Sequence, residues 1–154
     1  MDLSIRSLTS EDADQIEQLY AQSVAYLRAL GDDTDFQFNA RIYLRDGFGE
    51  QPAFAGLGAV WNGNLVGYLL YTFGYDPDRA IRYLFILDLL VDQGVRNQGI
   101  GKALMRTAAS VCQEEGGREL FWSVYAKNTQ AQDFYKRLGA EAVTDLQFMR
   151  LKVL

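Results

Sequence analysis

Two periods of apolar residues run along the chain and predict alternating strands and helices. Alternating or continuous apolar runs predict strands at residues 3–8, 54–61, 65–73, 82–91 and 120–125, with one or two more within 141–153. Apolar residues three and four positions apart predict helices at 16–30, 38–45, 103–111 and 128–138. The run at 82–91 is almost continuously apolar, which predicts a central strand buried on both faces. The order βααβββαβαβ indicates a mixed α/β sheet flanked by helices.

Length and composition narrow the class of protein. The 154 residues contain no repeat or linker, which predicts one domain over residues 1–154. One Cys and no His exclude an internal disulfide and any His-activated nucleophile, and argue against a zinc-type metal site. The net charge of −5 argues against nucleic acid as a partner and suits a cationic small substrate. No apolar run reaches roughly 18 residues, and no secretory signal is present. We therefore expect a cytoplasmic protein that does not contact a membrane.

The segment from Val91 to Lys102 carries the clearest chemistry. It joins the predicted central strand to a helix and reads Val-Asp-Gln-Gly-Val-Arg-Asn-Gln-Gly-Ile-Gly-Lys. A loop that opens a helix presents unpaired backbone N–H groups, and these bind phosphate with help from the helix dipole. Arg96 and Lys102 add positive charge. The alternative is a plain strand–loop–helix turn.

Two common phosphate loops do not fit this segment. Gly94 and Gly99 have the separation of a Walker A loop, but Ile100 stands where that pattern requires Lys. A dinucleotide fingerprint requires a third Gly where Leu104 stands.

The segment resembles the acetyl-CoA loop of the GNAT superfamily of N-acyltransferases, Gln/Arg-x-x-Gly-x-Gly/Ala, through Arg96, Gly99 and Gly101. Residues 128–140, Asn-Thr-Gln-Ala-Gln-Asp-Phe-Tyr-Lys-Arg-Leu-Gly-Ala, resemble the second signature of that superfamily. Both signatures occur in the superfamily's order and spacing, so the resemblance covers essentially the whole chain. It implies a GNAT-like, mostly antiparallel sheet and acetyl-CoA as co-substrate, with no metal.

Three further segments resemble the diamine acetyltransferases of the spermidine/spermine and thialysine type. They are residues 46–52, 68–77 and 87–91. In those enzymes an acidic, substrate-contacting Glu precedes the Asp of the last segment, whereas this chain has Leu87 before Asp88.

The resemblance also implies which residues hold acetyl-CoA. The backbone of the strand end would pair with the pantetheine arm as an added strand does, and the loop would surround the pyrophosphate. The implied residues are Leu89, Leu90, Val91, Arg96, Asn97, Gln98, Gly99, Ile100, Gly101, Lys102, Asn128 and Ala131. Each of these groups has an alternative role. The side chains of 89–91 would pack in the core, Arg96 would be a surface cation, and Asn128 would be a helix N-cap.

By the same resemblance, Tyr135 is the general acid that protonates the leaving CoA thiolate. A phenol with a pKa of about 10 can donate to a thiolate whose conjugate acid has a pKa of about 8.5. The alternative is that Tyr135 is a core residue on a helix face.

The pattern around Cys112 indicates a buried and inert thiol.

The attacking amine must first lose a proton, because only on the order of one alkylamine in a thousand is neutral near pH 7.4. Without His, the candidate bases are Asp88, Glu50, Tyr83 and Asp35. Asp88 lies in the predicted buried strand, where its pKa can rise, so it is the chosen catalytic base. Its alternative is a paired structural carboxylate.

Substrate contacts are expected from Tyr26, Glu50 and Leu87. Asp32, Asp33 and Asp35 form either an acidic mouth for a cation or a solvated loop. The expected activity is acetyl transfer from acetyl-CoA to a primary amine of a small molecule such as a polyamine or an amino acid, by direct attack. The alternatives are a CoA-binding module without catalysis, an N-acetyltransferase for a peptide or protein amine, and a structural α/β protein. The resemblance also implies a homodimer, and the apolar C-terminal edge near Phe148, Leu151 and Val153 supports it.

Overall fold

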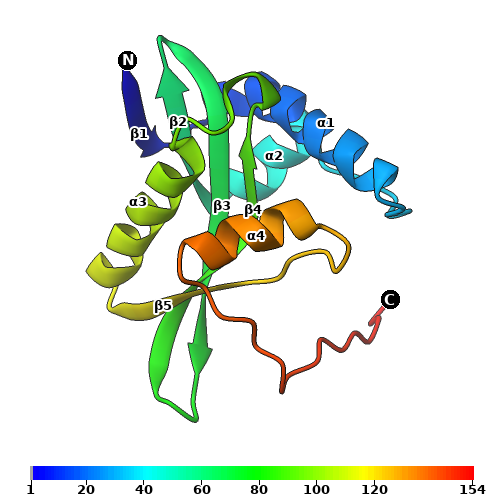
Figure 1. Cartoon of the computed structure of the whole chain (residues 1–154), viewed down its shortest axis with the longest axis vertical. Coiled ribbons are helices and arrows are strands. Elements are labelled where there is room, and N and C mark those ends of the chain that lie inside the picture. The colour runs from blue at the N-terminus through cyan, green and yellow to red at the C-terminus, as the bar shows by residue number, and fades with distance from the viewer. Residues whose placement is uncertain (1) are drawn as a thin grey trace. The chain divides into compact units, whose positions relative to one another are not determined.

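The computed structural model describes residues 2–154, and they divide between Ser123 and Val124 into two compact units (Figure 1). The first unit contains β1 (Leu3–Ser7), η1 (Ser10–Asp12), α1 (Ala13–Ala29), α2 (Ala40–Gly47), β2 (Ala55–Trp61), β3 (Asn64–Asp76), β4 (Ile81–Val91), η2 (Gln93–Val95), α3 (Ile100–Glu114) and β5 (Gly117–Trp122). The second unit contains α4 (Thr129–Arg137). A single domain over residues 1–154 stays a prediction.

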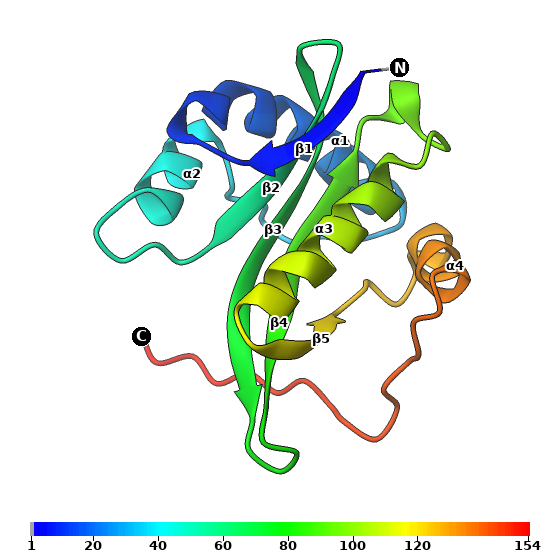
Figure 2. The ribbon, with the colours of Figure 1, turned by 90° about the vertical axis from the view of Figure 1, so that its left-hand side faces the viewer.

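One five-stranded sheet organises the first unit. Its strands follow chain order, with β1 to β4 antiparallel and β5 parallel to β4. Helices α1 and α2 cover one face and α3 covers the other (Figures 1 and 2). This arrangement confirms the predicted mixed α/β class. It also explains the long apolar run of β4, which lies between β3 and β5 beneath helices on both faces.

The strands predicted within residues 141–153 are absent, so this prediction is wrong. Residues 140–154 form no strand or helix. Their large apolar side chains are exposed, from 51% at Val143 to 114% at Leu154. An alternating pattern forms a strand only when a neighbouring strand pairs with its backbone, and within the described chain this segment has none.

A compact core joins the sheet to α1 and α2. It is built from Leu8, Ala13, Ile16, Leu19, Tyr43, Leu65, Tyr68, Leu70 and Leu90. Aromatic rings extend it toward the loop before α2, where Phe38 contacts Tyr20, Tyr43 and Phe54 edge-on. Because edge-to-face aromatic pairs add to area burial, this core fixes α1 and α2 against β3 and β4.

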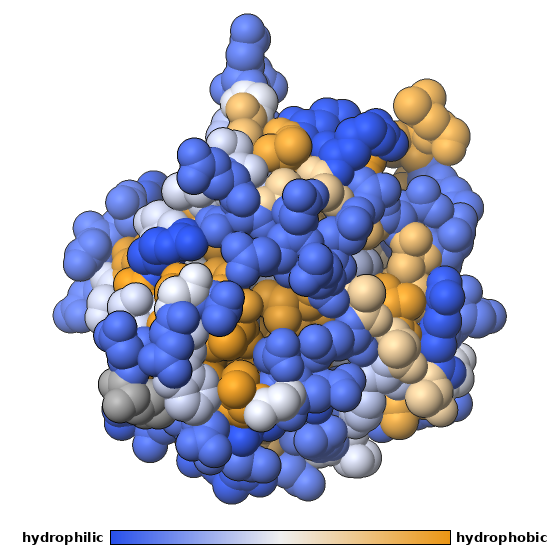
Figure 3. Space-filling view, turned by 90° about the horizontal axis from the view of Figure 1, so that it is seen from above, coloured by the Kyte–Doolittle hydropathy of each residue, from blue (hydrophilic) through white to orange (hydrophobic). Residues whose placement is uncertain are grey.

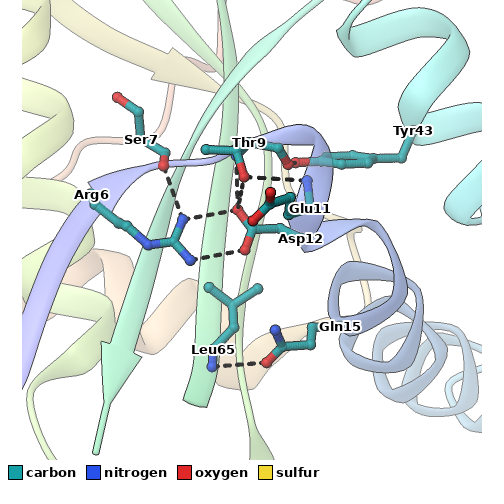
Figure 4. Close-up of polar contacts among 8 residues, drawn as sticks. All are labelled: Arg6, Ser7, Thr9, Glu11, Asp12, Gln15, Tyr43 and Leu65. Carbon is teal, nitrogen blue, oxygen red and sulfur yellow. Dashed lines mark hydrogen bonds and ion pairs between the residues drawn. The ribbon is translucent and has the colours of Figure 1, made fainter. Parts of the chain in front are cut away.

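An ion pair and a helix cap tie β1 to the start of α1 (Figure 4). The guanidinium of Arg6 donates to both carboxylate oxygens of Asp12 at 2.9 Å, and Asp12 is only 3% exposed. The same carboxylate accepts the backbone N–H of Thr9 at 2.8 Å, which completes a capping box. The hydroxyl of buried Tyr43 donates to the carbonyl of Thr9 at 2.7 Å. Hydrogen bonding from Arg6 holds the pKa of Asp12 below its usual range.

Asp12→Asn should lower the free energy of unfolding at pH 7 by about 2 kcal/mol, because it removes a charge-assisted pair and weakens a cap. A lowered pKa means that Asp12 stabilises the fold above its unfolded pKa of about 3.9, and that this contribution is lost as the pH falls. The difference between variant and wild type, measured by urea unfolding, should therefore narrow in acid.

Asp46→Asn is the matched control. Asp46 pairs with Arg45 at 2.8 Å, but both side chains are at least one-third exposed. An exposed pair contributes little, so this variant should stay within about 0.5 kcal/mol of wild type. Equal losses in the two variants would contradict the stated role of the Asp12 cap.

Two surface findings complete the fold. No helix in the described residues is long and apolar enough to cross a membrane. The face seen in Figure 3 is mostly hydrophilic, with apolar residues in smaller patches.

Candidate functional site

The end of β4 has an open edge. Strand β4 pairs with β3 from Ile81 opposite Asp76 to Val91 opposite Gly67, with Leu87 left without a partner. On the other side, its pairing with β5 ends at Ile86 opposite Trp122. In the described chain, residues 87–91 therefore have a strand neighbour on one side only. An edge of this kind can accept an extended ligand as an added strand.

The loop after β4 is tied down in its first half. The side chain of Asp92 accepts the N–H of Gly94 at 2.8 Å, and Gln22 of α1 accepts the N–H of Gln93 at 3.1 Å. The guanidinium Nε of Arg96 donates to the carbonyl of Val91 at 3.2 Å. Arg96 thus anchors the loop to the strand end, a role that the sequence pattern does not distinguish from ligand contact.

The second half of the loop leads into α3 without a side-chain cap. Asn97 and Gly99 have positive φ angles of 62° and 79°, and Gly99 is the N-cap. Glycine adopts this conformation without strain, which explains why it stands there. The first N–H groups of α3 have no partner within the helix, and they lie at its positive end. The loop therefore presents backbone donors and a partial positive charge to an anion.

Side-chain positions around the loop separate anchors from exposed groups. Asn97, Gln98, Gly99 and Lys102 are exposed. Ile100 is 1% exposed and lies in the core, so only its backbone is available to a ligand. A Cβ at Gly67 would come within 2.9 Å of the carbonyl of Leu90, so a glycine there keeps β3 close to the end of β4.

A β-bulge at Leu87 turns Asp88 to the opposite face of the sheet. Ile86 pairs with Tyr71, whereas Asp88 pairs with Leu70, so one residue of β4 has no partner. Tyr71 and Leu70 are adjacent and point to opposite faces, and so do Ile86 and Asp88. Asp88 therefore faces the core beneath α1 and α2, while Leu87 is 47% exposed.

Asp88 meets a phenol on that face. The hydroxyl of Tyr68, whose side chain is fully buried, donates to Oδ2 of Asp88 at 2.6 Å. Burial raises the pKa of Asp88, and hydrogen bonds from Tyr68 and the backbone of Leu89 oppose this rise. Burial and the charge of Asp88 also raise the pKa of Tyr20, on α1. A carboxylate with a raised pKa is suited to accepting a proton near neutral pH.

Three comparisons with known proteins bear on this arrangement. A model of the acetyltransferase (GNAT) family matches residues 14–140. The chain belongs to the GNAT acetyltransferase family. This confirms the resemblance, and it confirms at the level of the family the prediction of an N-acetyltransferase.

Individual relatives agree with the family. The chain is similar to the thialysine N-epsilon-acetyltransferase of Bos taurus, with 34% identity over 110 residues that make up 66% of this chain and 64% of that protein. It is also similar to an L-amino acid N-acetyltransferase of Escherichia coli (strain K12), with 25% identity over 143 residues, 91% of this chain and 83% of that protein. The match thus spans less than two thirds of the bovine relative's length.

The fold agrees with solved structures of the family. The ribosomal-protein-alanine N-acetyltransferase of Brucella melitensis biovar Abortus 2308 superposes with a TM-score of 0.77 at 22% identity, covering 98% of this chain and 100% of that one. At this identity the likeness concerns the fold alone.

Within this GNAT chain, the other predicted polar residues belong to different elements and loops. Glu50 and Asp35 are exposed, and Tyr26 is a half-buried residue of α1. The ring of Tyr83 packs against Gly74 and meets Phe121 edge-on at 5.5 Å. Cys112 is 3% exposed and its thiol lies 3.5 Å from the carbonyl of Glu119, which agrees with a packing role. Burial raises the pKa of Asp88, which supports its assignment as the base.

The second unit holds the other signature. The side chain of Asn128 accepts the N–H of Ala131 at 3.1 Å and so caps α4. Tyr135 lies on α4, half-buried, with its ring 5.3 Å from that of Phe134. Helix α4 ends at Arg137 with Leu138 as its C-cap, and Gly139 follows with a φ of 94°. The N-cap that was the alternative role of Asn128 is confirmed, and the ligand roles of Asn128, Ala131 and Tyr135 stay predictions.

Sequence reasoning missed Tyr68 and Tyr20. Tyr68 occupies an apolar position in a strand, and Tyr20 occupies one on the apolar face of α1. Neither position differs in pattern from a core residue. The signal that could have found Tyr68 is the bulge, and a bulge depends on strand pairing rather than on local sequence.

Proposed function

We propose that this chain transfers the acetyl group of acetyl-CoA to a primary amine of a small molecule, such as a polyamine or an amino acid. The observation that carries the proposal is the open end of β4 beside the uncapped start of α3. An added-strand edge and an anion site lie next to each other there, as a ligand with an amide-containing arm and a diphosphate requires. Membership of the GNAT family supports the same reading.

The chain's own groups account for binding. Backbone groups of Leu89, Leu90 and Val91 would pair with the pantetheine arm, and N–H groups of residues 97–102 would hold the pyrophosphate. Arg96 keeps the loop in place through Val91. Asn128 and Ala131 would contact the arm from the other signature. Acetyl-CoA supplies an activated acyl group as a thioester.

Two proton transfers complete the proposed reaction. Asp88 accepts the proton of the ammonium form of the substrate, so that a neutral amine attacks. A backbone N–H near Val91 stabilises the charge that develops on the carbonyl oxygen. Tyr135 gives its proton to the departing sulfur. Binding both reactants in one orientation supplies much of the rate, and no covalent bond to the protein is required.

The acceptor is proposed to approach Asp88 past Leu87, with Tyr26 and Glu50 as further contacts. Leu87 is exposed where diamine acetyltransferases have a Glu. An apolar side chain cannot pair with a second ammonium group, so acceptors with one amine should be preferred to long polyamines.

Release of free CoA thiol tests the activity. Purified protein should release thiol from acetyl-CoA with at least one member of a panel of polyamines, amino acids, aminoglycosides and peptides with free N-termini. Turnover with peptides alone would favour the alternative of a peptide or protein acetyltransferase. Tight CoA binding with no thiol release from any amine would contradict the proposal and favour a binding module.

We also propose that the enzyme is a homodimer. The exposed apolar side chains of Phe148, Leu151 and Val153 would be covered in a homodimer. Light scattering at the mass of one 17.4-kDa chain would contradict this. A cytoplasmic location, and the absence of nucleic acid and membrane partners, stay predictions.

A further inference from the structure

We propose that Tyr68 is a positioning residue for this reaction, whose hydroxyl fixes the carboxylate of Asp88 in the orientation that accepts the proton of the amine. The inference rests on the proposed function, because it assigns a partner to the base of that same site. Tyr68 lies in the core, outside the two GNAT signatures.

Local geometry leaves Asp88 dependent on Tyr68. The bulge at Leu87 brings Asp88 onto the face where Tyr68 lies, and the two oxygens are 2.6 Å apart. Tyr68 is fully buried, and its position beside Leu90 in the same core cluster holds its ring. A rigid donor on one carboxylate oxygen leaves the second oxygen of Asp88 with a defined direction.

The charge of Asp88 argues against a purely structural role for this carboxylate. The ion pairs within the described residues join Arg6 to Asp12, Arg45 to Asp46, and Arg79 to both Asp76 and Glu119. Asp88 is in none of them. Asp88 is half-buried, and a carboxylate without a cation there carries a desolvation cost that a neutral side chain accepting the same hydrogen bond would avoid. A carboxylate at this position therefore favours a chemical role.

The proton inventory is consistent with this role. Within the described residues, Asp88 acts on two titratable groups, Tyr68 from β3 and Tyr20 from α1, and raises the pKa of both. Burial and the neighbouring Asp88 raise the pKa of Tyr68 well above its usual value, so Tyr68 keeps its proton and only donates. In the step itself, the N–H bond of the ammonium group breaks and an O–H bond forms on Asp88. Nothing is oxidised or reduced.

Tyr68→Phe tests the proposal, because it removes the hydroxyl and keeps the ring. Removing a donor to the charged carboxylate raises the pKa of Asp88, so the acidic limb of the kcat/KM profile should move to higher pH. At pH 7 we expect a loss of roughly tenfold or more in kcat/KM, the size of one hydrogen bond to a charged group. The KM for acetyl-CoA should not change. A structural defect would lower the whole profile without moving its limb.

Tyr71→Phe is the matched control. It removes a half-buried hydroxyl from the same strand on the opposite face and should leave the limb in place. In an Asp88→Asn background, Tyr68→Phe should cause little further loss, since the two residues act as a unit.

A readout without turnover separates this proposal from the activity itself. The carboxyl signal of Asp88 can be followed by carbon NMR, with Asp88→Asn for assignment, and its titration should move to higher pH in Tyr68→Phe. An unmoved titration would overturn the proposal even if the enzyme is active. A moved titration together with an unmoved kcat/KM limb would overturn it as well, because Asp88 would then not be the base. Absence of any turnover would refute the proposed activity instead, and the titration alone would then decide whether Tyr68 controls Asp88.

Discussion

Replacing Tyr135 with Phe is expected to lower kcat by a factor of about 10² to 10⁴, the usual contribution of a general acid. The phenol is the group proposed to protonate the thiolate, and Phe keeps the ring that contacts Phe134. Affinity for acetyl-CoA should stay within a factor of about two, because no binding contact is assigned to the hydroxyl. Thiol release and calorimetry measure the two quantities.

Tyr125→Phe is the control for this variant, since Tyr125 lies in the same unit and its carbonyl, not its hydroxyl, binds Asn128 and Gln132. It should retain wild-type kcat. Full activity of Tyr135→Phe would contradict the assigned acid, and a parallel loss of acetyl-CoA affinity would indicate a binding role instead.

Asp88→Asn is expected to lower kcat/KM at pH 7 by a factor of about 10² or more, because an amide cannot accept the amine's proton. In wild type, burial raises the pKa of Asp88, so activity should rise with pH as this carboxyl ionises. The variant should lose that limb. At high pH, where the free amine is abundant, the two enzymes should approach each other in rate.

For stability, Asp88→Asn should have the opposite effect to Asp12→Asn. A carboxyl whose pKa is raised in the folded state stabilises the fold below its unfolded pKa, and this contribution is lost as the pH rises through the folded pKa. Asp88→Asn should therefore be as stable as wild type at pH 7, or more stable, while Asp12→Asn is less stable. An Asp88→Asn protein that unfolds more readily would identify Asp88 as a structural carboxylate, the alternative that its sequence position leaves open.

Much of the fold could be predicted because periodicity and burial coincide in it. The run at 82–91 matches β4 (Ile81–Val91), since a strand covered on both faces has to be apolar throughout. The predicted strand at 120–125 occurs earlier, at Gly117–Trp122, because pairing with β4 and not apolar content sets its limits. The C-terminal strands failed for the same reason: residues 141–153 have the alternation without a partner strand.

The parts of the site that follow from a local backbone motif could be predicted from the sequence. The parts that follow from the register of strand pairing could not. Gly99 and the start of α3 follow from a local motif, and the positive φ at Gly99 agrees with it. The orientation of Asp88 could not be read from the chain. Simple alternation places Asp88 on the same face as Ile86, and only the bulge at Leu87 turns it toward Tyr68.

Amide NMR of the labelled protein, titrated with CoA, tests the central claim most directly. The claim is that the open end of β4 and the start of α3 form one binding surface for the coenzyme. We predict saturable shifts of the backbone amides of residues 89–91 and 97–102 together, with the same apparent affinity. Saturable shifts confined to other elements, or no shifts at any CoA concentration, would contradict the account.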